Sequence, residues 1–180
     1  MRVFMDPESS AEPALSVEEL DLLKQRAARY AMAAEAQTDD ITDAIIFRRG
    51  TAKYAVPLVA LREVRPLRSF SPIPSASRTV PGIFHFRGEV LSLHDVAAFM
   101  EPAVAADDPA WVIVVEHGGE RIGLGADEIL DVERHASGAV QMLPVTFGDR
   151  GAICDGLLPN AAVLLSAPRM FHTDAFFSAF

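Results

Sequence analysis

The residues of this sequence that could do metal or nucleophilic chemistry are five histidines and one cysteine. No two histidines have the HxxxH spacing that places both rings on one helix face, and an isolated histidine is more often structural than a ligand. Cys154 lies in the apolar stretch GAICDGLL, where a thiol is usually inert packing. The histidines are His85, His94, His117, His135 and His172. We therefore predict no metal site and no catalytic cysteine.

A glycine-rich string, GGERIGLG at residues 118–125, could suggest a phosphate-binding loop. Such a loop must open a helix, whose first N–H groups hold the phosphate, but this string joins two apolar runs that resemble strands. A hairpin turn is therefore the better interpretation. No serine has the glycine flanks of a nucleophile elbow. The sequence predicts neither an active site nor a cofactor.

A charge interrupts the apolar run VPGIFHFRGEVLSLHD, residues 80–95. The run predicts a hairpin in which Ile83, His85 and Arg87 share one face, with Gly88 beside Arg87 in the turn. The nearest earlier acid in ordered structure is Glu63, in the segment LREV. Two interpretations remain open at this point: a solvated arginine at a turn, or a salt bridge between Glu63 and Arg87.

Composition limits the function classes. Half of the 180 residues are apolar, and 25 acidic residues outnumber 16 basic ones, which leaves a net charge of −9. Nucleic acid is a poor partner for such a chain, because phosphates require a basic face. One cysteine excludes an internal disulfide, and no window resembles a signal peptide or a membrane span. We expect a cytoplasmic protein whose partners are proteins or small molecules.

The elements that would position these residues are short strands separated by turn signals. Hairpins are expected for 44–47 with 53–56, for GIFHF with EVLSL, and for WVIVVEH with RIGLGA, which DEILDVERH continues. Short helices are expected at 58–64, after Pro57, and at DVAAFM, residues 95–100. The apolar run AAVLL precedes a predicted C-terminal helix. This pattern predicts an all-β fold of two small antiparallel barrels in succession, near 44–100 and 110–165.

An N-terminal extension, residues 1–40, precedes the strands. Ser16 and Glu19 form a capping box, and an apolar stripe from Leu20 to Ala34 predicts a helix over residues 15–36. Its shallow, alanine-rich face could lie on the main domain. The less favoured alternative is that it pairs with a partner or with a second copy of the chain, which would make a homo-oligomer.

Five segments occur in a recognisable order: LREV (61–64), SPIP (71–74), GIFHFRG (82–88), LSLHDV (91–96) and WVIVVEHGGERIGLGADEILDV (111–132). Together they resemble the bacterial chemotaxis coupling protein family, CheW. The resemblance covers about residues 44–170, and it places a CheW-like domain at 41–180. Each segment is weak alone, but their order along the chain is specific.

The resemblance implies a non-catalytic scaffold of two five-stranded barrels related to Src-homology-3 barrels, with short helices. Family members bind the regulatory domain of the histidine kinase CheA and the cytoplasmic tip of a chemoreceptor, without entering the membrane. In the family, residues matching Glu63 and Arg87 pair and are needed for coupling. We expect an apolar groove between the barrels, lined by LREV, IGLGADEI and AAVLL; the candidate partner-binding residues are Leu61, Glu63, Val64, Ile83, Arg87 and Ile129.

The sequence also departs from the family pattern. His85 stands where the family has asparagine, Leu91 where it has proline, and Ser166 where it has an acid. These departures leave open an orphan double-barrel module that binds an unrelated partner in another signalling system. An enzyme or small-molecule binder on the same scaffold is a third alternative, which the lack of polar clusters disfavours. A pull-down with a receptor tip and a kinase regulatory domain would discriminate among them.

Overall fold

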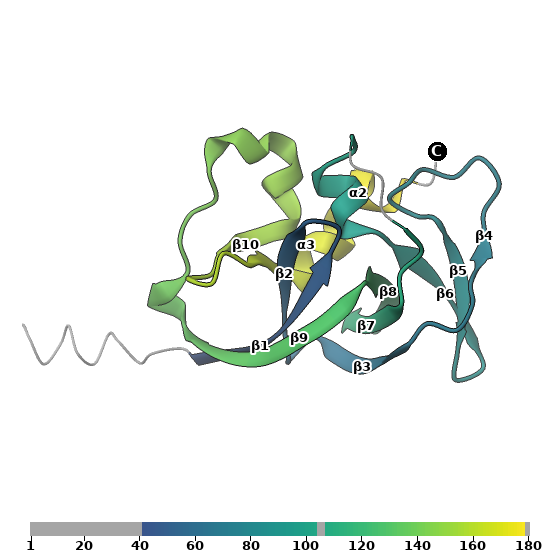
Figure 1. The fold of residues 1–180 in the computed structure, drawn as a ribbon, viewed down its shortest axis with the longest axis horizontal. Helices are drawn as coiled ribbons and strands as arrows, with labels where there is room; N and C mark the ends of the chain where they lie inside the picture. The colour runs from purple at the N-terminus through teal and green to yellow at the C-terminus, as the bar shows by residue number, and fades with distance from the viewer. Residues whose placement is uncertain (1–40, 104–106, 179–180) are drawn as a thin grey trace, which may run out of the picture. The chain divides into compact units, whose positions relative to one another are not determined.

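The computed structural model describes residues 41–103 and 107–178, and it shows two β-sheets accompanied by short helices (Figure 1). The predicted helix at 15–36 lies outside the described residues. One sheet has five strands in the order β10-β11-β2-β1-β9, and the other has six in the order β3-β7-β8-β6-β5-β4. The expectation of an all-β fold with two barrel-like units is confirmed.

The five-stranded sheet is built from the two ends of the described chain, and we call it the terminal barrel. Gly50, at φ 61°, makes the tight turn between its first two strands. β1 then pairs on its other side with β9, which lies after the whole six-stranded sheet in the chain. The strands are β1 (Ile41–Arg49), β2 (Ala52–Pro57), β9 (Glu128–Ala136), β10 (Cys154–Leu157) and β11 (Val163–Leu165).

The six-stranded sheet uses the middle of the chain, and we call it the central barrel. Both predicted hairpins of this region are confirmed: β5 pairs with β6, and β7 pairs with β8 across Gly118 and Gly119. The sixth strand, β4, has only two residues. The strands are β3 (Leu61–Pro66), β4 (Ser71–Pro72), β5 (Gly82–Phe86), β6 (Glu89–His94), β7 (Trp111–His117) and β8 (Glu120–Ala126).

The predicted barrel boundaries, 44–100 and 110–165, are wrong. The central barrel occupies 61–126 and is inserted between the two parts of the terminal barrel. Only Asp127 separates β8 from β9, yet β9 leaves the central barrel and pairs with β1. Local alternation identifies strands and hairpins, but it carries no information about which hairpins pair across long stretches of chain.

The short helix predicted at 58–64 is also wrong. Pro57 ends β2, a turn closed by the bonds Ala60 N to Pro57 O and Leu61 N to Leu58 O follows, and β3 then pairs with β7. A run of so few apolar residues does not distinguish helix from strand by periodicity, and pairing with β7 decides it. The helix expected at DVAAFM is present as α2 (Val96–Met100), with Asp95 as its N-cap.

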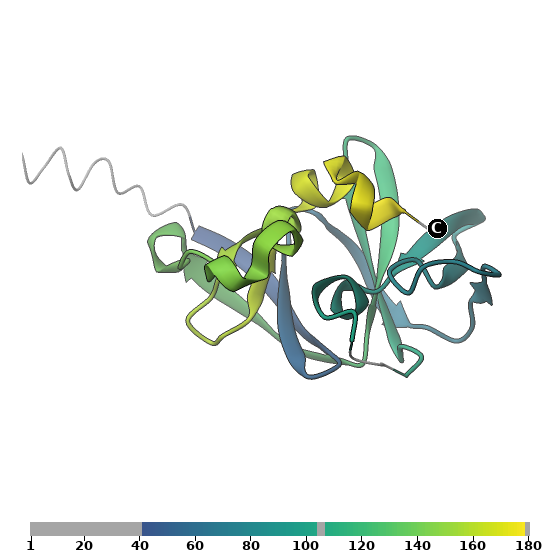
Figure 2. The same cartoon turned by 90° about the horizontal axis from the view of Figure 1, so that it is seen from above.

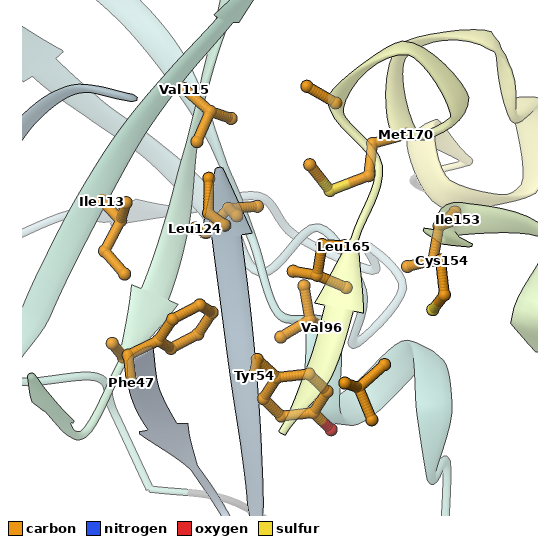
Figure 3. Close-up of a cluster of buried hydrophobic side chains, with 14 of the residues drawn as sticks. Phe47, Tyr54, Val96, Ile113, Val115, Leu124, Ile153, Cys154, Leu165 and Met170 are labelled. Atoms are coloured by element: carbon orange, nitrogen blue, oxygen red, sulfur yellow. The ribbon is translucent and has the colours of Figure 1, made fainter. Parts of the chain in front are cut away.

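One hydrophobic core is shared by the two barrels (Figure 3). Phe47 and Tyr54 from the terminal barrel lie beside Ile113 and Leu124 from the central barrel, and Val96 of α2 packs among them. Each barrel also has a smaller core of its own, around Ile46 and around Phe84 respectively. The barrels therefore depend on each other for much of their apolar burial.

The C-terminal helices cross from one barrel to the other (Figure 2). The predicted C-terminal helix is present as two short helices, α3 (Ala167–His172) and α4 (Asp174–Phe177), which follow β11 of the terminal barrel. Phe176 of α4 is fully buried and stacks on His94, the last residue of β6 in the central barrel. These helices thus cover part of the shared core from one side.

Candidate partner-binding site

The central barrel is incompletely closed by backbone hydrogen bonds. Its sheet order places β3 and β4 at opposite ends, and β4 pairs only with the first two residues of β5. The rest of β5 comes next to β3, where Arg65 Nη2 donates to the carbonyl of His85 at 3.0 Å. We call this junction of β3 with the β5–β6 hairpin the barrel seam. Among the described residues, side chains rather than a strand ladder join it.

The structure brings Glu63 and Arg87 together across the barrel seam. Arg87 Nε and Nη2 donate to Glu63 Oε2 at 3.0 Å and 2.6 Å. Arg87 and Gly88 form the turn of the β5–β6 hairpin, and both have positive φ, 50° and 87°. The Arg87 side chain is 75% exposed and that of Glu63 26%. Both interpretations of Arg87 hold in part, because the arginine is paired and also solvated.

Phe86 lies under the two arginines of the barrel seam. Its ring is buried, and the guanidinium carbons of Arg65 and Arg87 lie 5.9 Å and 5.5 Å from its centre. Contact with the negative face of an aromatic ring favours a guanidinium and restricts its position. Both arginines are therefore held in place by Phe86 as well as by their hydrogen bonds.

A network of ion pairs continues from the barrel seam onto β7 and β8. Glu116 accepts from Arg62 at 2.7 Å and from Arg121 at 2.9 Å, and Arg121 also donates to Glu89 at 2.8 Å. The hydrogen bonds from Arg62 and Arg121 lower the pKa of Glu116. A hollow of about 250 Å³ beside Arg87 is lined by Arg62, Glu63, Phe86, Arg87, Glu116 and Arg121. Its two glutamates neutralise most of the charge of its three arginines, so shape and hydrogen bonding would largely decide what it binds.

The other candidate residues are distributed over both barrels. Leu61 and Val64 lie in β3, half-buried against the shared core, and Ile83 in β5 is 37% exposed. Ile129 is also half-buried against the shared core, but it belongs to β9 of the terminal barrel. The structure therefore gathers Glu63 and Arg87 at the barrel seam with Ile83 on the same hairpin, and it places Ile129 on a different sheet.

The predicted lining of an apolar groove is wrong for two of its three segments. Ile122, Leu124 and Ala126 of the IGLGADEI segment are buried in the shared core, and AAVLL is buried from Ala162 to Leu165. These strands have apolar residues on both faces and are covered on both, as near-continuous apolar runs usually are. The LREV segment and Ile129, the last residue of IGLGADEI, remain at the margin of that core.

Sequence reasoning missed a buried ion-pair cluster where the two barrels meet. Arg49, at the end of β1, donates to Asp95 at 2.5 Å and 3.2 Å and to Asp127 at 2.6 Å. Burial opposes the charge on Arg49, but the hydrogen bonds and charges of Asp95 and Asp127 outweigh it and leave the pKa of Arg49 raised. The sequence contains one signal for this cluster: Arg49, Asp95 and Asp127 each stand at the end of an apolar run.

The thiol and the glycine-rich string that were considered for catalysis both have structural roles in the fold. Cys154 is buried, which raises the pKa of its thiol to about 12, so the reactive thiolate is suppressed. In GGERIGLG, Gly118 and Gly119 form the β7–β8 turn, and Gly123 and Gly125 lie in β8. Within 41–103 and 107–178, no group of three or more His, Cys, Asp or Glu residues could hold a metal ion. In the same ranges, no helix is long and apolar enough to cross a membrane.

Known proteins are similar to this chain over most of the domain that the structure describes. The profile of the CheW-like domain matches residues 43–170. The chain belongs to the CheW-like domain family. The chemotaxis protein CheW of Rhizobium meliloti (strain 1021) is 30% identical over 113 residues, which cover 62% of this chain and 73% of that protein. The match therefore includes both barrels and the barrel seam.

Two further CheW proteins support the family and the fold. The chemotaxis protein CheW of Helicobacter pylori (strain ATCC 700392 / 26695) is 22% identical over 138 residues, covering 76% of this chain and 84% of that protein. The crystal structure of the scaffolding protein TtCheW from Thermoanaerobacter tengcongensis superposes with a TM-score of 0.60 at 19% identity, over 70% of this chain and 84% of that one. At this identity the superposition supports the CheW-like fold alone.

Proposed function

We propose that this protein is a non-catalytic chemotaxis scaffold that couples chemoreceptors to a CheA-type histidine kinase. Its partners would be the regulatory domain of the kinase and the cytoplasmic tip of the receptor. Family membership over residues 43–170 supports the scaffold role, since the relatives are chemotaxis proteins and one is described as a scaffolding protein. The buried thiol agrees with a role that needs no reactive group.

The observation that carries this proposal is the exposed ion pair at the barrel seam. Arg87 is held by Glu63 and by the ring of Phe86, yet three quarters of its side chain remains accessible. A charged group that is both fixed and exposed can meet a partner without a large loss of side-chain entropy. Leu61, Val64 and Ile83 lie on β3 and β5, which meet at the barrel seam, and would supply adjoining apolar contacts, with Ile129 as a separate contact on β9.

A pull-down of the full chain with a receptor tip and a kinase regulatory domain from the same cell tests the proposal. We expect the wild-type chain to retain both proteins and Arg87→Glu to lose at least one of them. Arg134→Glu is the matched control, because Arg134 is an exposed, carboxylate-paired arginine on β9 and the change in net charge is the same. Retention of neither protein by the wild-type chain would contradict the proposal.

An orphan module for an unrelated partner is the alternative, and it rests on the departures from the family pattern. Leu91 and Ser166 are buried, so these two departures act on packing and do not reach a partner directly. His85 is exposed on the same strand face as Ile83, and it alone alters the candidate surface. Failure to retain either chemotaxis protein, with the fold intact by circular dichroism, would favour the alternative.

A further inference from the structure

A second hollow lies beside the barrel seam, between β5 and the loop that follows β3. Its volume is about 310 Å³. Its polar lining residues are exposed or half-exposed, and they are Arg65, Arg68, Ser69, Ser71 and His85. Its apolar lining, which we call the apolar floor, consists of Phe70, Ile83 and Phe84. The hollow thus combines apolar surface with two arginines.

The charge of this hollow is opposite to that of the whole chain. No acidic residue lines it, although the chain has 25 acidic residues and only 16 basic ones. Arg68 is exposed and makes no ion pair or hydrogen bond within the part of the chain that the structure describes. Arg65 uses Nη2 for the His85 carbonyl and has further donors available. An unpaired arginine beside a second one favours a negatively charged ligand.

The edge of the sheet next to this hollow opposes strand addition. β4 is only Ser71–Pro72, and Pro66 and Pro74 flank this region of the chain. Proline has no N–H to donate, so an added strand would find few donors here. The ligand must therefore be recognised through side chains.

We propose that this hollow binds an acidic, amphipathic segment of a partner protein. One apolar side chain of the segment would cover Phe70 and Ile83, and neighbouring carboxylates would accept hydrogen bonds from Arg65 and Arg68. A free phosphate would leave the apolar floor exposed to water. A nucleic acid or an anionic membrane carries many charges beyond the hollow, which the chain's net charge of −9 repels, whereas a short segment can confine its few carboxylates to the two arginines. This site differs from the ion pair at Arg87, whose charge is already balanced by Glu63.

Binding of a short synthetic peptide to the full chain tests this inference independently of any chemotaxis protein. The peptide has leucine on one helical face and glutamate on the other, and a matched peptide has glutamine in place of glutamate. Fluorescence anisotropy of the labelled peptides gives Kd. We expect the glutamate peptide to bind with a Kd at least about tenfold lower than the glutamine peptide, and added salt to weaken binding.

Charge reversal assigns the binding to this hollow. Arg68→Glu should raise the Kd of the glutamate peptide about tenfold or more, because one attraction is replaced by a repulsion. Arg134→Glu, on β9 of the terminal barrel, changes the net charge by the same amount and should leave the Kd nearly unchanged. Circular dichroism of both variants confirms that they are folded.

Three results would overturn the inference. The first is equal Kd values for the glutamate and glutamine peptides, and the second is equal weakening by Arg68→Glu and Arg134→Glu. The third is the absence of peptide binding together with binding to phosphatidylserine vesicles that Arg68→Glu abolishes, which would assign the hollow to a membrane surface instead.

Discussion

At the residue scale, Arg87 has a clear geometric role in the barrel seam but contributes little to the free energy of unfolding. Arg87 takes a left-handed backbone conformation, which costs a non-glycine residue about 1 kcal/mol. Its ion pair with Glu63 is largely exposed, and such pairs contribute about 0 to 1 kcal/mol. The two effects nearly cancel, so the pair orients the Arg87 charge without adding much stability.

A double-mutant cycle with Glu63→Gln and Arg87→Asn tests this balance. Asparagine tolerates the left-handed turn conformation, so this change removes the charge while it keeps the hairpin. We expect a coupling free energy below about 1 kcal/mol in urea denaturation, together with loss of partner retention in the pull-down. A coupling of several kcal/mol would show that the pair is mainly structural.

His94 is the buried titratable residue with the clearest consequence for stability. Its Nδ1–H donates to the Phe176 carbonyl at 3.2 Å, and its Nε2 accepts from the Ser92 hydroxyl at 2.8 Å, so both nitrogens are satisfied in the neutral ring. Burial lowers the pKa of His94 from its ordinary 6.5 to about 4. The folded protein therefore binds fewer protons than the unfolded chain between these two values.

Stability should consequently fall as the pH drops from 6.5 towards 4, because protons then favour the unfolded chain. The loss of unfolding free energy attributable to His94 is about 3 kcal/mol by pH 4, and above pH 6.5 this contribution is fully present. Urea denaturation at several pH values measures it. His94→Gln should lower stability at neutral pH and flatten the dependence over this window. An unchanged slope in that variant would contradict the assignment to His94.

At the element scale, Asp95 joins three parts of the fold. Its Oδ1 accepts from the backbone N–H groups of Ala97 and Ala98 at the start of α2, and its Oδ2 accepts from Arg49 at the end of β1. Arg49 in turn contacts Asp127, which separates β8 from β9. One cluster therefore fixes the helix, the first hairpin and the crossing between barrels.

Asp95→Ala should lower the free energy of unfolding by about 3 to 5 kcal/mol, because it leaves the buried Arg49 charge poorly compensated and removes the helix cap. Asp95→Asn can keep the cap and should cost less. Asp127→Ala is the positional control: Asp127 is 24% exposed, and its loss leaves Arg49 paired with Asp95. Urea denaturation of the three variants measures these differences. Equal losses for Asp95→Ala and Asp127→Ala would contradict the central role of Asp95.

At the scale of the whole molecule, the shared core makes the two barrels one folding unit. The terminal barrel is assembled from both ends of the described chain, so forming it around an unfolded central segment would cost the entropy of closing that segment as a long loop. The large side chains from both barrels that fill the shared core would be exposed if either barrel unfolded alone.

We therefore expect a single cooperative unfolding transition. Trp111, the sole tryptophan of the chain, begins β7 of the central barrel, whereas far-UV circular dichroism reports on both barrels. The two signals should change at the same urea concentration. Leu124→Ala, in the shared core, should lower the unfolding free energy by about 2 to 5 kcal/mol and shift both signals together. Separate transitions would show that the barrels unfold independently.

The sequence by itself determined the strands of the three tight hairpins and the position of Arg87 in a turn, but it missed β3. These features depend on side-chain alternation and on glycines such as Gly50 and Gly88, which act over a few neighbouring residues. The same patterns, together with the family resemblance, pointed to Glu63 as the partner of Arg87 and to a double barrel.

Only the tertiary structure decided how the hairpins combine and which surfaces remain free. Three features depend on residues that are far apart in the chain. They are the pairing of β9 with β1, the ion pair of Arg49 with Asp95, and the packing that buries Ile122 and Leu164. Such contacts depend on loop closure and on burial in a shared core, whose free energy belongs to the assembled fold and leaves no short-range pattern in the sequence.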